Sequence, residues 1–460
     1  MQTDSAGKAT RIQLANFSSP QMRAFHLSWI AFFFCFFSWF GVAPLMKVVR
    51  NELQLTGEQV GWCIIGSVAA TILARLLVGV LCDRYGPRIT YTWLLILGSV
   101  PVMGIALSGN FAQFLVFRIL IGAIGASFVI TQFHTSLMFA PNCVGTANAT
   151  AAGWGNLGGG VTQIAMPLLF SLFVGVIGLS ESVSWRLAMV IAGAACALVG
   201  VAYYFLTQDT PQGDFRALRA AGKLPSKKMN GRAFLEACGD RRVWALFAIY
   251  GACFGIELTI DNIAVLYFVD YFDYFKQLDA TESLKIAGFI AALFGGMNIF
   301  ARALGGWVGD KCGQRWGFSG RVKWLFIALF CEGIGLMLFS QATVLAVAIP
   351  LMITFALFVK MSNGATYAVV PFIKREAVGT VSGIVGAGGN VGAVAAGFLF
   401  KTQGLDWHTA LFILGAAVTA ISFSAFAVAF QPQTERESRV ELAPNRLANA
   451  DAPDLAGASS

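Results

Sequence analysis

Charged residues are scarce in this chain. Asp, Glu, Lys and Arg together make up 12% of its 460 residues, and hydrophobic residues make up 57%. A soluble globular protein carries roughly 25% charged residues. A chain this long and this apolar is expected to be an all-α polytopic membrane protein. Its net charge of +8 therefore does not indicate a nucleic-acid partner. In membrane proteins, Lys and Arg in loops set the orientation.

Histidines and paired cysteines are also lacking. The three histidines, His26, His134 and His408, are dispersed, and no nucleophile–base constellation accompanies them. The nine cysteines are scattered, and no two have the spacing of metal ligands. We therefore expect neither an enzyme nor a protein that holds a metal or cofactor. The cysteines are expected to be small buried hydrophobic residues.

A cleavable signal pattern is missing from the start of the chain. The polar residues 1–22 precede an apolar run that is long enough to span a membrane, and we expect that run to be a retained first helix. Since a spanning helix needs about 20 mostly apolar residues, the sequence predicts twelve of them. They are expected at about 24–48, 58–82, 89–109, 112–139, 143–175, 185–206, 241–270, 285–309, 321–340, 343–371, 377–400 and 408–430.

Loop charges predict the orientation. The longest polar interruption, 207–242, carries more Lys and Arg than Asp and Glu, which is typical of a cytoplasmic loop. The loop at 270–285 is acidic and falls on the opposite side. We expect a 1–22 cytoplasmic tail, a 23–206 six-helix bundle, a 207–240 basic cytoplasmic linker, a 241–431 six-helix bundle and a 432–460 disordered cytoplasmic tail.

The two bundles read as a duplication. Gly79-x-x-x-Asp83-Arg84-x-Gly86 follows the second helix, and Gly306-x-x-x-Asp310-Lys311-x-Gly313 follows the eighth. An arginine precedes each aspartate by eight residues. Arg118-x-x-x-Gly122 on helix 4 is answered by Lys360-x-x-x-Gly364 on helix 10. Parallel six-helix repeats predict a transporter whose site lies near the midplane, between the halves.

A glycine-rich stretch with one asparagine occurs once in each half. Ala151–Gly160 contains Gly155-Asn156-x-Gly158, which returns downstream as Gly389-Asn390-x-Gly392. Glycines let helices approach closely, and they also permit sliding, so we expect packing and gating from them. A lone asparagine in lipid costs free energy unless it has a partner, which favours substrate contact or support for a nearby group over packing alone. The glycines concerned are Gly153, Gly155, Gly158, Gly159, Gly388, Gly389 and Gly392.

Arg75 and Arg302 are the two arginines of the repeat, one on each half. Each lies about 12 Å deeper than the aspartate on its helix, at about 1.5 Å per residue. An arginine at the bilayer centre costs at least ~2.5–3.5 kcal/mol, which a bound anion between the two would offset. Two planar guanidinium forks suit a small planar oxyanion. The alternative is a structural arginine that pairs with a carboxylate or with carbonyls.

Glu257 and Asp261 lie four residues apart on helix 7 and so share a face. Two neighbouring carboxylates in a poorly hydrated cavity form a proton site. Alternatively, both are solvated near the extracellular end or pair with Lys276 or Lys285. Arg118 is a candidate partner of Glu257 or an attractor of the anion, with an interfacial charge as the alternative. The role of Lys360 stays open.

The Asp-Arg-x-Gly loops resemble the signature of the major facilitator superfamily. The two glycine–asparagine stretches resemble the nitrate-signature motifs of its nitrate/nitrite porter family. The segments 25–29, 43–45, 255–262 and 363–366 resemble further stretches of the high-affinity nitrate transporters of that family. The resemblance covers roughly 23–430 and is closest to the plant and bacterial high-affinity nitrate transporters. It implies that Arg75 and Arg302 bind the substrate anion, that Phe128 and Tyr250 line its site, and that Asp83, Arg84, Asp310 and Lys311 form conformational loops.

The free-energy cost of anion import restricts the possible modes of transport. Importing an anion against an inside-negative potential costs about 2.3 kcal/mol per 100 mV, so a uniporter would expel nitrate. We therefore expect a nitrate/proton symporter of assimilation type in the cell membrane, with nitrate/nitrite antiport as the alternative. A non-transporting sensor is a more remote alternative, since it needs no symmetric pair of arginines. We expect a monomer; the sequence leaves open any accessory subunit, the nitrate-to-nitrite preference and the proton stoichiometry.

Overall fold

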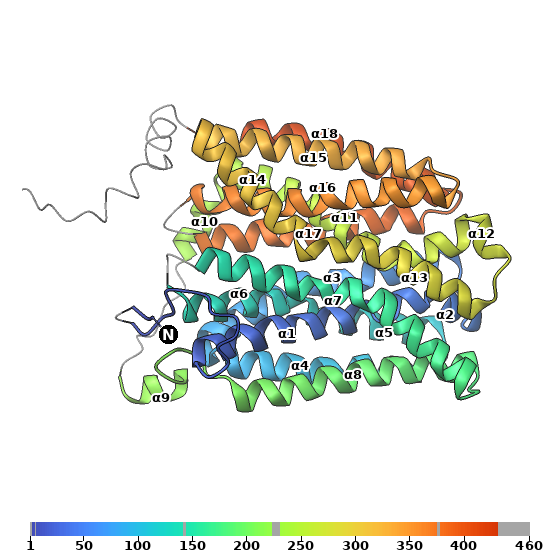
Figure 1. Cartoon of the computed structure of the whole chain (residues 1–460), viewed down its shortest axis with the longest axis horizontal. Coiled ribbons are helices and arrows are strands. Elements are labelled where there is room, and N and C mark those ends of the chain that lie inside the picture. The colour runs from blue at the N-terminus through green and yellow to red at the C-terminus, as the bar shows by residue number, and fades with distance from the viewer. Residues whose placement is uncertain (1, 5, 141–143, 223–230, 375–377, 431–460) are drawn as a thin grey trace, which may run out of the picture.

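The computed structural model describes residues 2–4, 6–140, 144–222, 231–374 and 378–430. Within these residues the chain is helical, and twelve stretches are long and apolar enough to cross a membrane, as the sequence predicts. The helices lie side by side along the long axis of the molecule (Figure 1). The boundaries of the two bundles and the linker stay predictions, and Cys143 and the 432–460 tail lie outside the described residues.

The first half occupies the lower part of Figure 1 and the second half the upper part. The first half contains α1 (Pro20–Phe40), α2 (Met46–Glu52), α3 (Gly57–Tyr85), α4 (Pro87–Gly104), α5 (Phe111–Gly122), α6 (Ser127–Met138), α7 (Val144–Ser171) and α8 (Glu181–Leu206). The connection holds α9 (Phe215–Ala220) and α10 (Gly231–Cys238). The second half contains α11 (Arg241–Tyr271), α12 (Asp273–Lys276), α13 (Ala280–Gly296), α14 (Ala301–Trp316), α15 (Phe318–Ser340), α16 (Leu345–Val369), α17 (Val378–Lys401) and α18 (Trp407–Ser422).

The two ends of the bundle differ. The N-terminal residues, α9 and α10 lie at one end, which we call the terminal end, and α2 and α12 lie at the other, the opposite end (Figure 1). The N-terminal residues fold back onto the first half: the Ala9 amide donates to the Met138 carbonyl, and the Ala140 amide to the Ala9 carbonyl, both at 2.9 Å. The Gln21 side chain donates to the Gly7 carbonyl at 2.6 Å. Residues before α1 are therefore part of the folded structure.

Helix α3 and its counterpart α14 each end at a glycine, but the two glycines occupy different positions in the sequence repeat. Gly86 stops α3 with a φ of +89°, a conformation that favours glycine. In the second half the helix continues through Gly313, and Gly317, with a φ of +72°, ends α14. The sequence repeat equates Gly86 with Gly313, but the structure places the corresponding chain reversal at Gly317.

A break in the eighth spanning segment positions Arg302. The 3₁₀ turn Met297–Ile299 separates α13 from α14, so Arg302 lies in the first turn of α14. In the first half, by contrast, Arg75 lies inside the continuous helix α3. The two arginines are therefore presented by different local backbones.

The two halves are in close contact toward the opposite end. The backbones of Gly160 on α7 and Gly295 on α13 meet there, and a Cβ built on Gly160 would lie 2.8 Å from the Gly295 Cα. A Cβ on Gly61 would lie 2.1 Å from the Lys401 Cβ. Across the same interface Lys47 pairs with Asp270 at 2.5 Å, and Arg50 pairs with the same carboxylate.

Toward the terminal end the corresponding positions are open. A Cβ on Gly79 of α3 or on Gly383 of α17 would meet nothing within 4 Å. The structure is therefore closed at the opposite end.

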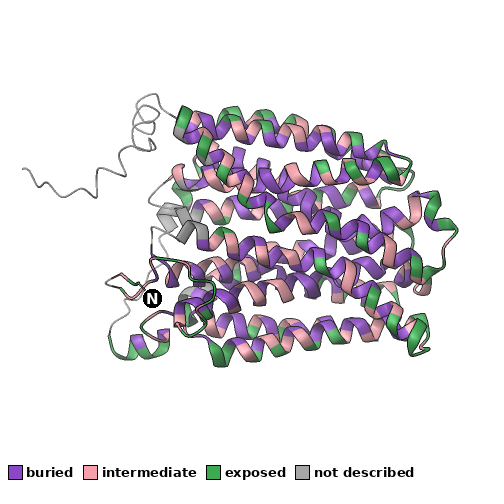
Figure 2. Cartoon of the chain, viewed as in Figure 1, coloured by how far each residue is buried: buried purple, intermediate pink, exposed green. Residues whose placement is uncertain are grey.

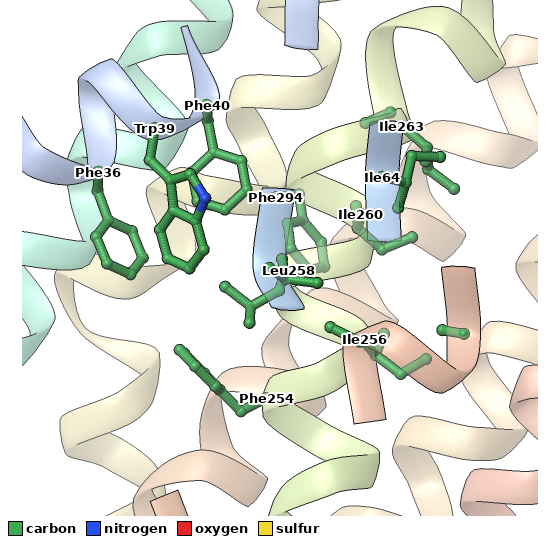
Figure 3. Packing of buried hydrophobic residues seen from close by; sticks show 14 of the residues in the cluster. Phe36, Trp39, Phe40, Ile64, Phe254, Ile256, Leu258, Ile260, Ile263 and Phe294 are labelled. Atoms are coloured by element: carbon green, nitrogen blue, oxygen red, sulfur yellow. The ribbon is translucent and has the colours of Figure 1, made fainter. Parts of the chain in front are cut away.

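Buried residues fill the spaces between helices, and exposed ones gather on the outer faces and at the ends (Figure 2). Many of the exposed residues are apolar, for example Leu107, which is 81% exposed. Exposed apolar faces on such helices suit contact with lipid tails. At the centre, Phe36, Trp39 and Phe40 lie near the Phe254–Ile263 stretch of α11 and Phe294 (Figure 3). This aromatic and aliphatic core surrounds the polar groups described next.

Candidate functional site

Arg75 projects from α3 across the interface between the halves. Its side chain is buried, and Nη1 donates to the Gly386 carbonyl of α17 at 2.7 Å. The guanidinium carbon lies 5.8 Å from the ring centre of Phe128 and 5.9 Å from that of Phe254. Nε has no hydrogen-bond partner among the described residues. Within the described part of the chain no carboxylate forms an ion pair with Arg75, so the group remains able to bind an anion.

Arg302 is the counterpart in the second half. Nη2 donates to the Tyr250 hydroxyl at 3.0 Å, and Nη1 has no partner within the described part of the chain. Its guanidinium carbon also lies 5.9 Å from the ring centre of Phe254. The two arginines thus lie against one ring, and their like charges repel each other. A shared anion would relieve that repulsion.

The walls of this site are aromatic. Tyr250 stacks on Phe254, with ring centres 5.1 Å apart and planes 9° apart, and Tyr367 meets Tyr250 edge-on at 5.1 Å. Phe128 and Tyr250 therefore lie beside the two arginines, and their contact with the substrate stays a prediction. Sequence reasoning missed Phe254 and Tyr367. The motif Gly386–Gly392 carried a signal for Phe254, because a glycine in a buried helix often faces a large ring.

The motif glycines hold helices together within each half. A Cβ on Gly155 would lie 1.9 Å from Phe32 Cδ1, and one on Gly389 would lie 2.5 Å from Phe254 Cδ1. A Cβ on Gly158 would lie 2.0 Å from the Phe33 carbonyl oxygen of α1. In the second half, Gly388 and Gly392 face the Phe247 and Gly251 carbonyls of α11, at 2.3 and 2.0 Å. These positions require glycine for close packing.

Two glycines of the first motif face the other half instead. A Cβ on Gly153 would lie 3.1 Å from the Asn298 carbonyl, and one on Gly159 would lie 3.1 Å from Asp261 Oδ2. The first motif therefore combines packing within its half with contact across the interface. Gating by these glycines stays a prediction.

Asn156 and Asn390 are buried, at 2% and 0% exposure. Neither the amide nitrogen nor the carbonyl oxygen of either side chain has a hydrogen-bond partner among the described residues. A buried polar group that stays without a partner costs about 1–3 kcal/mol. Asn390 lies one turn after Gly386, which accepts from Arg75, and Asn156 lies one turn after Gly153, which faces Asn298. Both side chains remain available for substrate contact.

Glu257 is fully buried and completely partnered. Oε1 lies 2.7 Å from the Lys360 ammonium and accepts from the Asn298 amide at 2.9 Å, while Oε2 accepts from the Asn363 amide at 2.7 Å. The lysine also lies 4.2 Å from the ring centre of Phe294. The expected alternatives of solvation or pairing with Lys276 or Lys285 are wrong here, since Lys276 pairs with Asp273 and Glu257 with Lys360. Glu257 also interacts electrostatically with Arg302.

Arg118 does not partner Glu257. It is 1% exposed, and it donates to the Asn262 side chain at 2.7 Å and to the Trp39 carbonyl at 3.2 Å. An interfacial, solvated position is therefore wrong as well. Asp261, at 4% exposure, faces Gly159 across the interface between the halves. The roles of Arg118 and Asp261 in proton coupling stay predictions.

The loop residues are described in part. Arg84 is exposed, its carbonyl accepts from Arg219, and its guanidinium lies over Tyr85. Lys311 lies over Trp307, 5.9 Å from the ring centre. The side chains of Asp83 and Asp310 lie outside what the structure describes. Within the described residues, no group of His, Cys, Asp and Glu could hold a metal ion.

Known proteins match both the sequence and the fold. The model of the Major Facilitator Superfamily matches residues 28–397. High affinity nitrate transporter 2.5 of Arabidopsis thaliana is 39% identical over 91% of this chain and 82% of its own length. Nitrate/nitrite transporter NrtP of Nostoc punctiforme is 31% identical over 84% and 90%. The chain belongs to the nitrate/nitrite porter family of the major facilitator superfamily.

Solved structures show the same architecture for this porter. The partially occluded inward open form of the xylose transporter XylE from E. coli matches with a TM-score of 0.69 at 14% identity, over 90% of this chain and 99% of that one. A bacterial homologue of the lysosomal transporter Spinster, in an inward-facing and occupied form, also scores 0.69, at 16% identity over 91% and 98%. The superfamily match, the named relatives and the twelve candidate spans together make the porter a multi-pass membrane transporter and not an enzyme.

Proposed function

We propose that this porter imports nitrate across the cell membrane by alternating access, coupled to the entry of protons. The observation that carries the proposal is the pair Arg75 and Arg302, which come from symmetric places in the two halves and share the Phe254 ring. Both keep a guanidinium nitrogen without a partner among the described residues. The relatives, which are named nitrate and nitrate/nitrite transporters, support nitrate as the anion.

The chemistry of the site suits a small oxyanion. Each planar guanidinium presents paired donors to a carboxylate-like edge, and nitrate offers three equivalent oxygens in one plane. The free amides of Asn156 and Asn390 add donors near the same interface. The aromatic rings of Phe128, Phe254 and Tyr250 exclude water, which strengthens the attraction of the arginines for the anion.

The orientation follows from loop charge. If the Lys- and Arg-rich connection is cytoplasmic, the terminal end faces the cytoplasm and the opposite end faces outward. Both termini are then cytoplasmic, and the closed opposite end makes this the inward-facing arrangement. The ion pairs of Lys47 and Arg50 with Asp270 would then seal the outer entrance.

Proton coupling is proposed at Glu257. Its carboxylate interacts electrostatically with Arg302, so occupancy of the anion site changes the field at the acid. An anion on Arg302 weakens the stabilisation of ionised Glu257 and favours its protonation. Since anion import against the potential costs about 2.3 kcal/mol per 100 mV, more than one proton per nitrate is needed for the potential to drive uptake.

The test is electrogenic nitrate uptake in proteoliposomes with an acidic exterior and no internal nitrite. We expect an inward positive current for the wild type and its loss in Arg302→Lys and Glu257→Gln. Arg315→Lys, an exposed arginine on the same helix α14, is the matched control and should keep the current. Uptake that appears only with nitrite loaded inside, and that survives Glu257→Gln, would establish nitrate/nitrite exchange instead. Nitrate binding by the wild type without uptake in either assay would favour the sensor alternative, and absence of nitrate binding would favour another substrate.

A further inference from the structure

Glu332 is a third buried acid in the second half, besides Glu257 and Asp261, and it makes none of the contacts of the anion site. It lies inside α15, at 0% exposure, on a mostly apolar helix. Among the described residues neither of its carboxylate oxygens has a hydrogen-bond partner. An ionised carboxylate left in this state costs several kcal/mol. Its presence therefore calls for a compensating charge or a proton.

The groups that face Glu332 come from two helices. Lys360 and Ser362 face it from α16, and Glu257 interacts with it electrostatically from α11. Cys253 of α11 also interacts electrostatically with Glu332. On α18 the one titratable residue is His408, in the first turn, where it bonds to the Ser340 carbonyl and Tyr267. Arg302 of α14 is turned toward Tyr250. On α15 itself, Arg321 and Lys323 lie in the first two turns.

Among the described residues, no ion pair reaches Glu332. Lys360, with no exposure of its own, pairs with Glu257, and Arg302, which also interacts with Glu257, donates to the Tyr250 hydroxyl. Lys360 pairs with Glu257 at 2.7 Å, and Glu257 accepts two further amide hydrogen bonds. Glu332 has none of these partners. In this arrangement Glu257 is the favoured site for the negative charge, and Glu332 is the favoured site for a proton.

We propose that Glu332 is a second proton-binding residue, which shares one proton and the Lys360 partner with Glu257. In the form seen here Glu332 holds the proton and Lys360 pairs with ionised Glu257. In the alternative form the O–H bond of Glu332 breaks, an O–H bond forms on Glu257, and the Lys360 ammonium turns to the ionised Glu332. The charge of the three groups is the same in both forms, and Lys360 keeps three N–H bonds.

Proton transfer between Glu332 and Glu257 would link the anion site to Glu332. Glu257 interacts with both Arg302 and Lys360, so an anion at Arg302 makes Glu257 the better proton acceptor. The proton then comes from Glu332, and the lysine follows the charge. The Ser362 hydroxyl, which also lacks a partner among the described residues, faces Glu332 and can donate to it once it is ionised. This role rests on the proposed proton-coupled function.

The experiment is infrared spectroscopy of the purified full-length porter, which detects the carbonyl stretch of protonated carboxyl groups above the amide band. It compares the wild type with Glu332→Gln, Glu257→Gln and the exposed control Glu282→Gln, with and without nitrate. We expect a protonated-carboxyl band in the nitrate-free wild type that is lost in Glu332→Gln and kept in Glu282→Gln. Nitrate should shift this band in the wild type and leave it unshifted in Glu257→Gln.

A band that survives unchanged in Glu332→Gln would overturn the assignment. Should Glu332→Gln not fold, Glu332→Asp keeps a titratable group and should shift the band, whereas an unshifted band would also overturn it. Proteoliposomes separate this proposal from the one on which it rests. A wild type that takes up nitrate only in exchange for nitrite contradicts proton symport, whatever the band shows. A wild type that couples protons, with Glu332→Gln fully coupled, contradicts the role of Glu332 alone.

Discussion

Replacing Lys360 with methionine should strand Glu257 as a buried, uncompensated carboxylate. Lys360 and Glu257 are both fully buried, and the ammonium lies 2.7 Å from Oε1. Removing one partner of a buried pair costs about 3–5 kcal/mol. The variant can limit this cost by protonating the acid. At pH 7 that protonation costs about 3.7 kcal/mol, since the reference pKa of glutamate is about 4.3 and each unit is worth about 1.36 kcal/mol.

The destabilisation of Lys360→Met should therefore depend on pH. The folded variant holds a proton on Glu257 that the unfolded chain releases above about pH 4.3, so stability rises as pH falls. Between about pH 7 and about pH 5 the loss should shrink from about 3.7 to about 1 kcal/mol. The assay is thermal unfolding of detergent-solubilised protein across this range, each variant against the wild type at the same pH.

The double variant Glu257→Gln, Lys360→Met is the matched control. It removes both charges. The glutamine oxygen can accept from one of the Asn298 and Asn363 amides, and its NH2 group can donate to the Oδ1 of the other once that amide is turned. Replacing a buried ion pair as a whole often changes stability little. The double variant should therefore be more stable than Lys360→Met, and its stability should not depend on pH in this range. A loss in Lys360→Met that is equally large at low pH would refute the stranded charge. It would place the cost in lost packing against Phe294.

The remaining predictions concern packing, binding, closure and a loop. Gly158→Ala and Gly392→Ala place a Cβ 2.0 Å from a backbone oxygen of the neighbouring helix and should each cost about 1–3 kcal/mol in thermal unfolding, while Gly175→Ala, which meets nothing within 4 Å, should cost little. Tyr250→Phe removes the hydroxyl that accepts from Arg302 and should raise the nitrate KM by about three- to tenfold, as expected for about 0.5–1.5 kcal/mol; an unchanged KM would separate this hydroxyl from the site. Asp270→Asn removes the pairs with Lys47 and Arg50 and should shift spin-label distances toward an open opposite end, whereas Asp273→Asn, whose pair with Lys276 lies within one half, should not. Burial raises the pKa of Asp209 to about 6, so its stabilising contribution is complete below about pH 4 and is lost as pH rises through about 6; Asp209→Asn should flatten the stability profile in that window.

Much of the fold was readable from the sequence because lipid imposes strict rules. Each spanning helix must be long and apolar, and all twelve stand near their expected positions. The internal repeat identified Arg75 and Arg302, since a charge inside an apolar helix is costly and its recurrence in both halves indicates a purpose. The structure brings both to Phe254. The family assignment rested on the glycine–asparagine motifs, and the relatives confirm it.

The sequence does not show which buried charged residues pair with one another. Glu257 and Lys360 are far apart in sequence, and only the packing of α11 against α16 joins them. Arg118 occupied the matching place in the first half and was an equally reasonable partner, yet it bonds to Asn262. Glu332 could have been found by the rule that found the arginines, because it is an acid in an apolar helix. Without a counterpart in the other half it carried no repeat signal.

The two halves share the arginine of the repeat, but they differ in their buried acids. Helix α1 contains no Asp or Glu, whereas its counterpart α11 contains Glu257 and Asp261. Arg118 on α5 donates to the side-chain amide of Asn262, whereas Lys360 on the corresponding helix α16 pairs with the carboxylate of Glu257. The pair of arginines is thus built from both halves, whereas the proposed proton site is built from the second half alone. A substitution that disables the acids can therefore leave the arginine pair intact.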